Sequence, residues 1–284
     1  MRKTHLLFLI VLMLLFAVLP ALGEETSSAD SKALSLLVIN VRKADALLLR
    51  CGDTAYLIDI GTEESYEQMV RVLRDEGITR LTGVIITHTD KDHAGGLMDL
   101  MGSDIEIENV YASEYFNKKK ESKHPAVKAL KGTGQEVIFL SAGDTLPLDG
   151  GKLTVLGPLE WDEEKENNNS LVLLAEGGGG SILLTGDMEF PEEESLLEAG
   201  MIPHADVLKV GNHGNGDATS EELIKAVSPS LAVISTNTED KPDSPDSRVM
   251  KLLESSGAKV VVTQDTKNGI LVTLKDGNIL TEKK

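Results

Sequence analysis

The chain has 284 residues, of which 28 are Lys or Arg and 46 are Asp or Glu, and its formal net charge is −18. A hydrophobic share of 41% with a charged share of 26% is typical of a folded globular protein and excludes a disordered or fibrous one. The acidic balance argues against extended DNA binding, which needs clustered cations, and a single cysteine excludes an internal disulfide.

The first residues have the pattern of a secretory signal peptide. Two cations precede an uncharged apolar run over residues 6–19, and small residues around Gly23 offer a cleavage site. The run is shorter than the ~20 residues that cross a bilayer core, and the only cysteine, Cys51, is too far along the chain to carry a lipid anchor. We expect residues 1–23 to be removed, residues 24–33 to form a flexible leader, and the mature protein to be secreted or extracytoplasmic without stable membrane insertion. An uncleaved N-terminal anchor is the alternative.

Apolar runs bounded by turn residues predict the elements of the first half. Three strands come first, followed by a helix that begins at a Ser65–Gln68 capping box and ends before Gly77. A short buried strand then leads into a polar loop and a helix start at Gly95-Gly96. The expected strands are residues 34–39, 46–50, 55–60 and 84–87.

The second half repeats this general order and sets the expected fold. Gly177–Gly180 is interpreted as a hairpin turn and not as a phosphate cradle, because no helix follows it directly. Hairpins followed by βα units, twice over, predict an α/β (α+β) fold in which two mixed β-sheets pack face to face with helices outside, a four-layer αββα sandwich. No linker divides residues 34–284, so we expect a single domain. The expected strands are 153–156, 171–174, 182–184, 207–209, 231–234, 260–263 and 270–274, and the helices are 192–199, one after a Thr219–Glu222 capping box, and 247–256.

The segment VIITHTDKDHAGG, residues 84–96, carries the clearest chemical signal. It places His88, Asp90, Asp92 and His93 close together, directly after a buried strand and before a glycine-containing helix start. Side chains that leave a strand end can converge on one centre, and imidazole with carboxylate is a mixture that holds divalent metal. The segment therefore predicts a metal site, with a solvated surface loop as the alternative.

This segment resembles the HxHxDH motif of the metallo-β-lactamase fold, in the HxDxDH form of the ComEC-type competence proteins and their soluble relatives. Later segments resemble the other motifs of that group in the same order. These segments are INVRKADALLL, ENNNSLVLL, LLTGDME, LKVGNHG, and LAVIS followed by DSPDSRVMKLL. The resemblance implies a metallo-β-lactamase-like fold and a metal-dependent hydrolase.

Carried over by position, the resemblance implies two divalent metal ions with Asp187 as the bridging carboxylate. Catalysis would fall to Asp92, Asp187 and His213, with Asp92 orienting a metal-bridged hydroxide and His213 or Lys209 assisting the leaving group. Lys209, Asn169 and Asn212 would be substrate contacts, although a lysine or asparagine at a strand end is also an ordinary structural residue. The implied metal ligands are His88 and Asp90 for one ion, Asp92 and His93 for the other, with Asp187 and His213.

Three departures from the family pattern bear on the metal. Asn212 replaces the first His of a paired motif, Ser244 or Asp246 stands where a His is common, and Arg42-Lys43-Ala44 interrupts a glycine–glutamine strand ending. Fewer imidazoles and more oxygen ligands make a harder site, at which Mn²⁺ or Mg²⁺ competes better with Zn²⁺. The departures predict a second ion that binds weakly or only with substrate.

The leading hypothesis is an exported phosphodiesterase or nuclease-like hydrolase that acts on a small-molecule or envelope-polymer phosphodiester. A lactonase or β-lactamase type of carbonyl hydrolase is one alternative, and Asp90 and Asn212 count against it. A non-catalytic metal- or ligand-binding protein with a degenerate site is the other, and the retained Asp187 counts against that. The basic stretch at residues 115–131 is either a contact for a phosphate chain or a solvated helix face.

Overall fold

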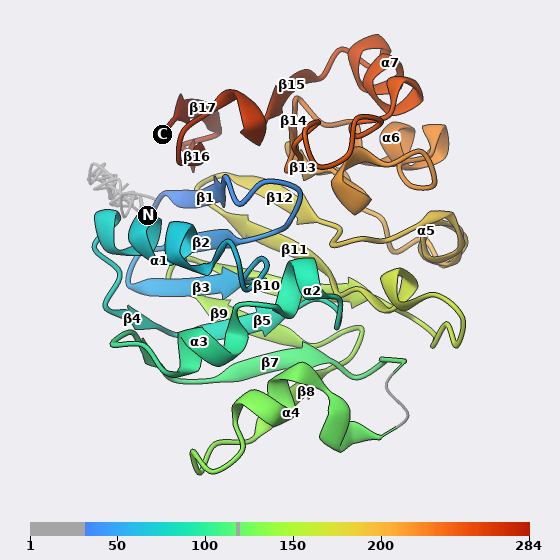
Figure 1. Cartoon of the computed structure of the whole chain (residues 1–284). Helices are drawn as coiled ribbons and strands as arrows, with labels where there is room; N and C mark the ends of the chain where they lie inside the picture. Colours follow the sequence, from blue (N-terminus) through green and yellow to red (C-terminus); the bar gives the residue numbers. More distant parts are fainter. Residues whose placement is uncertain (1–31, 118–119) are drawn as a thin grey trace, which may run out of the picture. The chain divides into compact units, whose positions relative to one another are not determined.

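Two large mixed β-sheets form the centre of the protein (Figure 1). The computed structural model describes residues 32–117 and 120–284. The expected signal peptide, most of the expected leader, and Lys118 and Lys119 of the basic stretch lie outside these residues. Lys32, near the end of the expected leader, forms an ion pair with Asp149 at 2.6 Å. No helix within the described ranges is long and apolar enough to cross a membrane.

The first sheet combines an antiparallel part with a parallel part. Strands β17, β16, β1, β2 and β3 pair antiparallel, and β5, β7 and β8 continue the sheet in parallel. In sheet order the strands are β17 (Asn278–Lys283), β16 (Gly269–Lys275), β1 (Leu34–Ile39), β2 (Leu47–Cys51), β3 (Thr54–Ile58), β5 (Gly83–Ile86), β7 (Val110–Ser113) and β8 (Val137–Leu140).

The second sheet has the same mixture of directions. Strands β9 to β12 pair antiparallel, and β13, β14 and β15 follow in parallel. The expected turn at Gly177–Gly180 is confirmed, since it joins β11 to β12 with φ of +62° at Gly178 and +79° at Gly179. In sheet order the strands are β15 (Lys259–Val262), β14 (Leu231–Ile234), β13 (Val207–Lys209), β12 (Gly180–Leu184), β11 (Val172–Gly177), β10 (Gly151–Gly157) and β9 (Thr145–Leu148).

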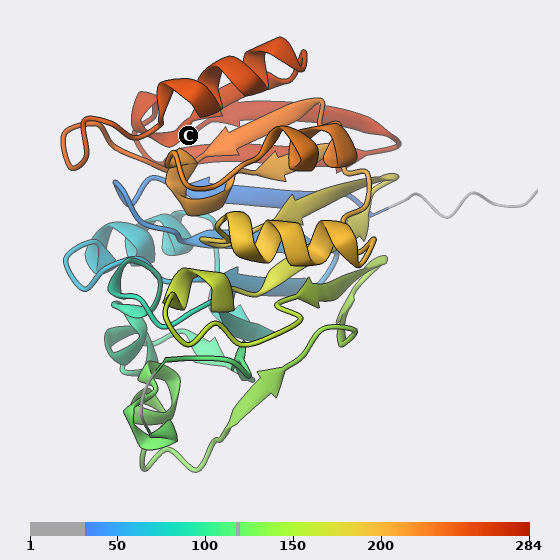
Figure 2. The same cartoon turned by 90° about the vertical axis from the view of Figure 1, so that its right-hand side faces the viewer.

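Alternating side chains divide each sheet between two hydrophobic layers. In β1, Leu36 and Val38 join the cluster between the two sheets, whereas Leu37 and Ile39 join the cluster under the outer helices. The first sheet is covered by α1, α3 and α4, and the second by α5, α6 and α7 (Figures 1 and 2). The expected four-layer αββα sandwich is therefore confirmed. The covering helices are α1 (Tyr66–Asp75), α3 (Leu97–Met101), α4 (Pro125–Ala129), α5 (Phe190–Glu198), α6 (Glu221–Val227) and α7 (Ser247–Ser255).

Two helix starts differ from the expected capping boxes. The Ser65 hydroxyl does not cap α1 and instead accepts a hydrogen bond from the Thr62 backbone N–H at 2.9 Å. In α6 the cap is Ser220, whose side chain accepts from the Leu223 N–H at 3.0 Å. Thr219 is one residue too early and adopts a φ of +63°. Both capping boxes are wrong because a competing local hydrogen bond sets the helix start.

Candidate metal centre

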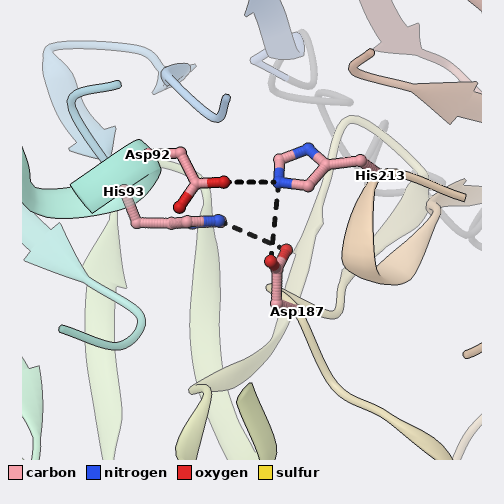
Figure 3. A group of neighbouring side chains, drawn as sticks. All are labelled: Asp92, His93, Asp187 and His213. Atoms are coloured by element: carbon pink, nitrogen blue, oxygen red, sulfur yellow. Dashed lines mark ion pairs between the residues drawn. The ribbon is translucent and has the colours of Figure 1, made fainter. Parts of the chain in front are cut away.

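Loops at the carboxyl ends of strands from both sheets bring four ligand side chains together (Figure 3). Asp92 and His93 lie on the short helix α2 (Lys91–Ala94) that follows β5, Asp187 follows β12, and His213 follows β13. One ligand atom from each of the four residues lies within 4.8 Å of all the others. One centre thus combines the motif after β5 with two segments that lie about a hundred residues further along the chain, after β12 and after β13.

Asp187 occupies the middle of this group and faces two imidazole rings. Its Oδ1 lies 3.3 Å from His93 Nε2, and its Oδ2 lies 3.5 Å from His213 Nε2. The same His213 nitrogen lies 3.5 Å from Asp92 Oδ2. Asp92 is the most open member, with 29% of its side chain exposed, whereas the side chains of the other three are buried.

The ligand atoms of these side chains have the burial and the chemistry expected around a bound cation. Nε2 of His88, His93 and His213 and Oδ1 of Asp187 are buried and have no hydrogen-bond partner among the described residues. Buried polar atoms are rarely left without a partner, because each would cost free energy on folding. Imidazole nitrogen and carboxylate oxygen are ligands of Zn²⁺ and related divalent ions. The residues present therefore fit a divalent metal.

Each ring is held by a hydrogen bond on its other nitrogen. Nδ1 of His93 lies 2.6 Å from Asp59 Oδ2, and Nδ1 of His213 donates to the Ser235 carbonyl oxygen at 2.9 Å. His88 Nδ1 lies 3.1 Å from the Thr87 hydroxyl. Such contacts fix the ring orientation and leave Nε2 to face the metal position.

Asp59 is a functional residue that the sequence reasoning missed. Its buried carboxylate contacts His93 and also accepts hydrogen bonds from the N–H and hydroxyl of Thr87, at 2.8 and 2.7 Å. It therefore holds the ring of His93, and it also bonds Thr87, the residue before His88. The available signal was a charged residue inside the apolar run expected as strand 55–60. In the structure, β3 ends at Ile58, just before Asp59, and neighbours β5 in the sheet.

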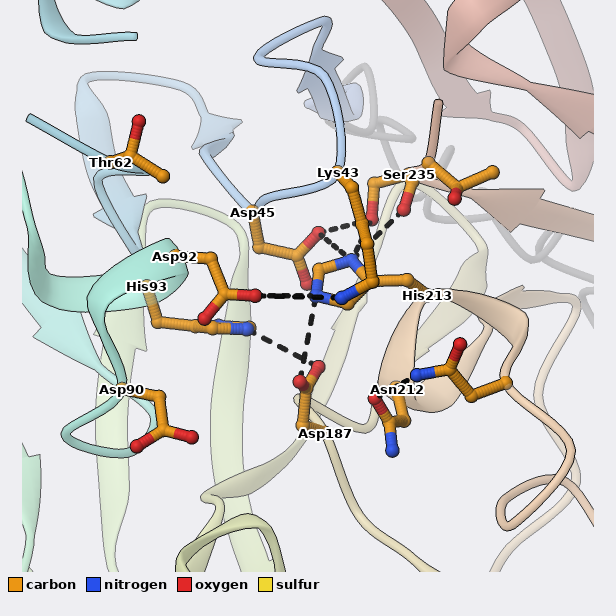
Figure 4. Close-up of polar contacts among 12 residues, drawn as sticks. Lys43, Asp45, Thr62, Asp90, Asp92, His93, Asp187, Asn212, His213 and Ser235 are labelled. Atoms are coloured by element: carbon orange, nitrogen blue, oxygen red, sulfur yellow. Dashed lines mark hydrogen bonds and ion pairs between the residues drawn. The ribbon is translucent and has the colours of Figure 1, made fainter. Parts of the chain in front are cut away.

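His88 and Asp90 lie beside the four-residue group. The His88 ring centroid is 4.1 Å from that of His93, and His88 Nε2 lies 3.9 Å from Asp90 Oδ2. Asp90 has 45% of its side chain exposed, and Figure 4 shows it below His93 at the edge of the site. Asp92 and His93, expected for one ion, thus form the compact part of the site together with Asp187 and His213. His88 and Asp90, expected for the other ion, are adjacent, with His88 buried and Asp90 exposed.

Lys209 and Asn169 are placed differently from the sequence expectation. Lys209 is completely buried, and its Nζ donates to Asp45 Oδ2 at 2.9 Å and to the Val210 carbonyl at 3.1 Å. Asn169 is also buried, and its side chain bonds the backbone N–H and carbonyl of Asp162. In this structure both side chains are buried and make internal hydrogen bonds, so neither faces a substrate.

Asn212 and Ser244 shape the loop that carries His213. Asn212 is buried, donates from Nδ2 to Asp217 at 3.1 Å, and accepts from Asn215 at 2.7 Å (Figure 4). The side chain expected to contact substrate therefore makes internal hydrogen bonds in this structure. The buried Ser244 hydroxyl donates to the His213 carbonyl at 2.8 Å. Asn212 thus bonds other side chains of the loop, and Ser244 bonds its backbone.

The charges of the metal-free site are strongly coupled. Burial alone would raise the pKa of Asp187, but His213 and His93 hold it well below its usual value. Burial opposes the charged form of His93, yet Asp187 and Asp59 raise its pKa well above 6.5, and carboxylates raise that of His213. Burial and the neighbouring His93 lower the pKa of His88 to about 3, so His88 is neutral.

Metal affinity is expected to rise with pH. The raised pKa values mean that His93 and His213 hold protons in the metal-free protein, and a ligand imidazole must lose its proton to bind the ion. Protons therefore compete with the metal below these pKa values, and the competition disappears as the pH rises through them. Calorimetric titration with Zn²⁺ in buffers of different ionisation enthalpy measures the protons released. Binding that is independent of pH and releases no protons would contradict this expectation.

Comparisons with known proteins agree with the observed fold. Residues 39–238 match the family described as the metallo-beta-lactamase superfamily. The chain is 32% identical over 195 residues to ComE operon protein 3 of Bacillus subtilis (strain 168), an alignment that covers 69% of this chain and 25% of that protein. The chain spans less than a third of the length of each of the curated relatives it matches, between 19% and 29%.

Two solved structures show the same fold at low identity. The metallo-beta-lactamase fold protein YhfI from Bacillus subtilis superposes with a TM-score of 0.56 at 14% identity, covering 85% of this chain and 99% of that one. A diphosphatase from the PhnP family superposes with a TM-score of 0.51 at 12% identity, covering 89% and 99%. The family match over most of the described residues, the αββα layers and the His/Asp centre lead to one conclusion: the chain belongs to the metallo-β-lactamase superfamily.

Proposed function

We propose that the protein is an exported, metal-dependent hydrolase that cleaves a phosphodiester in a small molecule or an envelope polymer. The observation that carries the proposal is the convergence of buried ligand atoms that make no hydrogen bond, Nε2 of His93 and His213 and Oδ1 of Asp187, on one point beside the partly exposed Asp92. A pure scaffold would leave these atoms at a cost in stability, whereas a bound cation satisfies them. The signal-like pattern of residues 1–23 supports export.

Asp92, His93, Asp187 and His213 would hold the first divalent ion, with Mn²⁺ or Zn²⁺ preferred and Mg²⁺ as a further option. When bound, such an ion supplies Lewis acidity that polarises a phosphoryl oxygen and makes water a better nucleophile at neutral pH. His88 and Asp90, with one Asp187 oxygen, would hold a second ion less tightly, because Asp90 is more open to solvent.

The remaining roles belong to side chains of this chain. Asp92 is the carboxylate of the group that reaches solvent, so it is placed to orient an attacking water molecule and accept a hydrogen bond from it. His213 keeps its Nδ1 proton on the Ser235 carbonyl, which leaves Nε2 for the metal and not for a leaving group. Lys209 does not assist a leaving group, because its side chain is buried against Asp45.

Phosphodiester substrates agree best with the oxygen-rich ligand set, and the net acidity of the chain limits their size. Carboxylates at Asp90 and Asp92 give a harder centre than one built mainly from imidazoles. The same fold is found in a structure described as a diphosphatase, so the architecture accommodates hydrolysis of a phosphate compound. The charge of −18 disfavours a long duplex and favours a small or single-site substrate.

Replacing Asp92 with Ala is expected to lower phosphodiester turnover by at least ~10²-fold, the scale at which a positioned acid–base group contributes. The measurement is hydrolysis of bis(p-nitrophenyl) phosphate by the Mn²⁺- or Zn²⁺-loaded protein, with a β-lactam and a lactone as carbonyl controls. Turnover that survives Asp92→Ala at the wild-type rate would sink the proposal. Hydrolysis of the carbonyl controls alone would favour a lactonase or β-lactamase activity.

A further inference from the structure

Lys43 places a cation at the open side of the metal centre. Its Nζ lies 3.6 Å from Asp92 Oδ2, and 19% of its side chain is exposed. Figure 4 shows the side chain reaching down beside the His213 ring toward Asp92. Lys43 belongs to the Arg42-Lys43-Ala44 segment, which follows β1 and precedes β2.

Contacts of Asn40 and Arg42 hold the backbone at Lys43 in place. Arg42 adopts a φ of +67° and its guanidinium contacts both oxygens of Asp240, with Nε at 3.0 and 2.9 Å. The Lys43 N–H points at the same carboxylate at 3.4 Å, and the Asn40 side chain accepts from Arg42 N–H and donates to the Thr266 carbonyl. A two-pronged arginine–carboxylate contact fixes orientation as well as distance. The position of Lys43 is therefore built into the loop.

The ammonium group of Lys43 still has donors to offer. Within the part of the chain that the structure describes, Nζ makes only the long ion pair with Asp92 and no hydrogen bond. A lysine ammonium carries three N–H donors. Lys209 provides the contrast, because its Nζ is buried and bonded to Asp45 and the Val210 carbonyl. Of these two lysines, Lys43 is the one that a substrate can reach.

With one metal ion bound, the carboxylates of the centre would cancel its positive charge, and Lys43 adds a further positive charge. Asp92 and Asp187 together neutralise one divalent ion, and Asp90 adds a further carboxylate beside them. A centre with a single ion then has no excess positive charge with which to attract an anion. Lys43 supplies one, at the side where the most exposed ligand, Asp92, meets solvent.

We propose that Lys43 is a substrate-binding residue that donates a hydrogen bond to a non-bridging oxygen of the scissile phosphate and so selects anionic over neutral substrates. The inference rests on the proposed phosphodiester hydrolysis and names the residue that recognises its anion. On binding, Lys43 exchanges its long contact with Asp92 for a phosphate oxygen, which leaves the Asp92 carboxylate free to orient water.

The test is calorimetric binding of inorganic phosphate to the metal-loaded full chain, in wild type and in Lys43→Met. Lys152→Met is the matched control, because it removes an exposed lysine that pairs with Glu176 in the β10–β11 hairpin, away from the metal loops. We expect phosphate affinity to fall about 10–100-fold in Lys43→Met, the loss of one hydrogen bond to a charged group, and to stay at the wild-type value in Lys152→Met. Metal content should be unchanged in both.

The outcomes separate the two proposals. Unchanged phosphate affinity in Lys43→Met, loss of metal from that variant, or no phosphate binding by the wild type would each overturn the role of Lys43. Bis(p-nitrophenyl) phosphate is assayed on the same samples. If phosphate affinity falls in Lys43→Met while the wild type shows no diester turnover, the anion site stands and the proposed hydrolase activity fails.

Discussion

Replacing Asp187 with Asn is expected to remove tight divalent-metal binding and, with it, hydrolytic activity. Asp187 faces His93 at 3.3 Å and His213 at 3.5 Å, so its two oxygens join the halves of the centre. The amide keeps the shape but loses the negative charge that balances a buried cation. Metal affinity should fall by more than the ~10–100-fold that accompanies loss of a partner outside the metal shell.

Glu189→Gln is the matched control for this change. Glu189 is a buried carboxylate two residues further along, which accepts from Asn167 at 2.8 Å and lies outside the four-residue metal group. Its variant should keep the wild-type metal content in elemental analysis, and circular dichroism should show both variants folded. A folded Asp187→Asn protein that retains its metal would show that the ligand assignment is mistaken.

Replacing Lys209 with Met is expected to lower the free energy of unfolding by ~3–5 kcal/mol, the cost of leaving one half of a buried ion pair without its partner. Asp45 is 1% exposed and Lys209 is 0% exposed. Burial by itself would raise the pKa of Asp45, but Lys209 and then His213 hold it below 3.8, so the carboxylate is charged in the native protein. Asp45 also accepts from the Ser235 hydroxyl, close to the carbonyl that orients His213.

A double-mutant cycle measures this pair. Urea unfolding of Lys209→Met, Asp45→Asn and the double variant gives three free energies. Because both single variants disrupt the same pair, the double variant should lose clearly less stability than the sum of the two. Strictly additive losses would mean that the Asp45–Lys209 contact contributes nothing to stability.

The regularity of buried strands explains why much of the fold was predictable from sequence. Strands β1, β13 and β14 begin and end where the sequence predicts, because each is a short, mostly apolar segment bounded by turn or polar residues. Two such series separated by helices already specify two sheets with covering layers, and the structure confirms them.

Several strands of the first sheet, β17 and β7 among them, were not predicted. In β17, residues 278–283, exposed and half-buried positions alternate, and the strand exists through its pairing with β16 at the sheet edge. In β7, Val110–Ser113, all positions are buried, and the strand lies between β5 and β8 in the sheet. Pairing with a neighbouring strand, and not local propensity, makes these segments strands.

In the site, too, residues that lie close together in the sequence were predicted, and contacts between distant residues were not. His88, Asp90, Asp92 and His93 are found together because one loop carries them all. The burial of Lys209 was not predicted, because it depends on a distant partner, Asp45, 164 residues earlier in the chain. Only the packing of β13 against the loop before β2 brings that pair together.

Elemental analysis of the purified protein, after equilibration with Mn²⁺ or Zn²⁺ and removal of free ions, tests the central claim most directly. That claim is that Asp92, His93, Asp187 and His213 form a divalent-metal centre. At least one ion should remain per chain, with a second where His88 and Asp90 take part, and the content should fall in His93→Ala. A folded wild-type protein that retains no ion of either metal would contradict it.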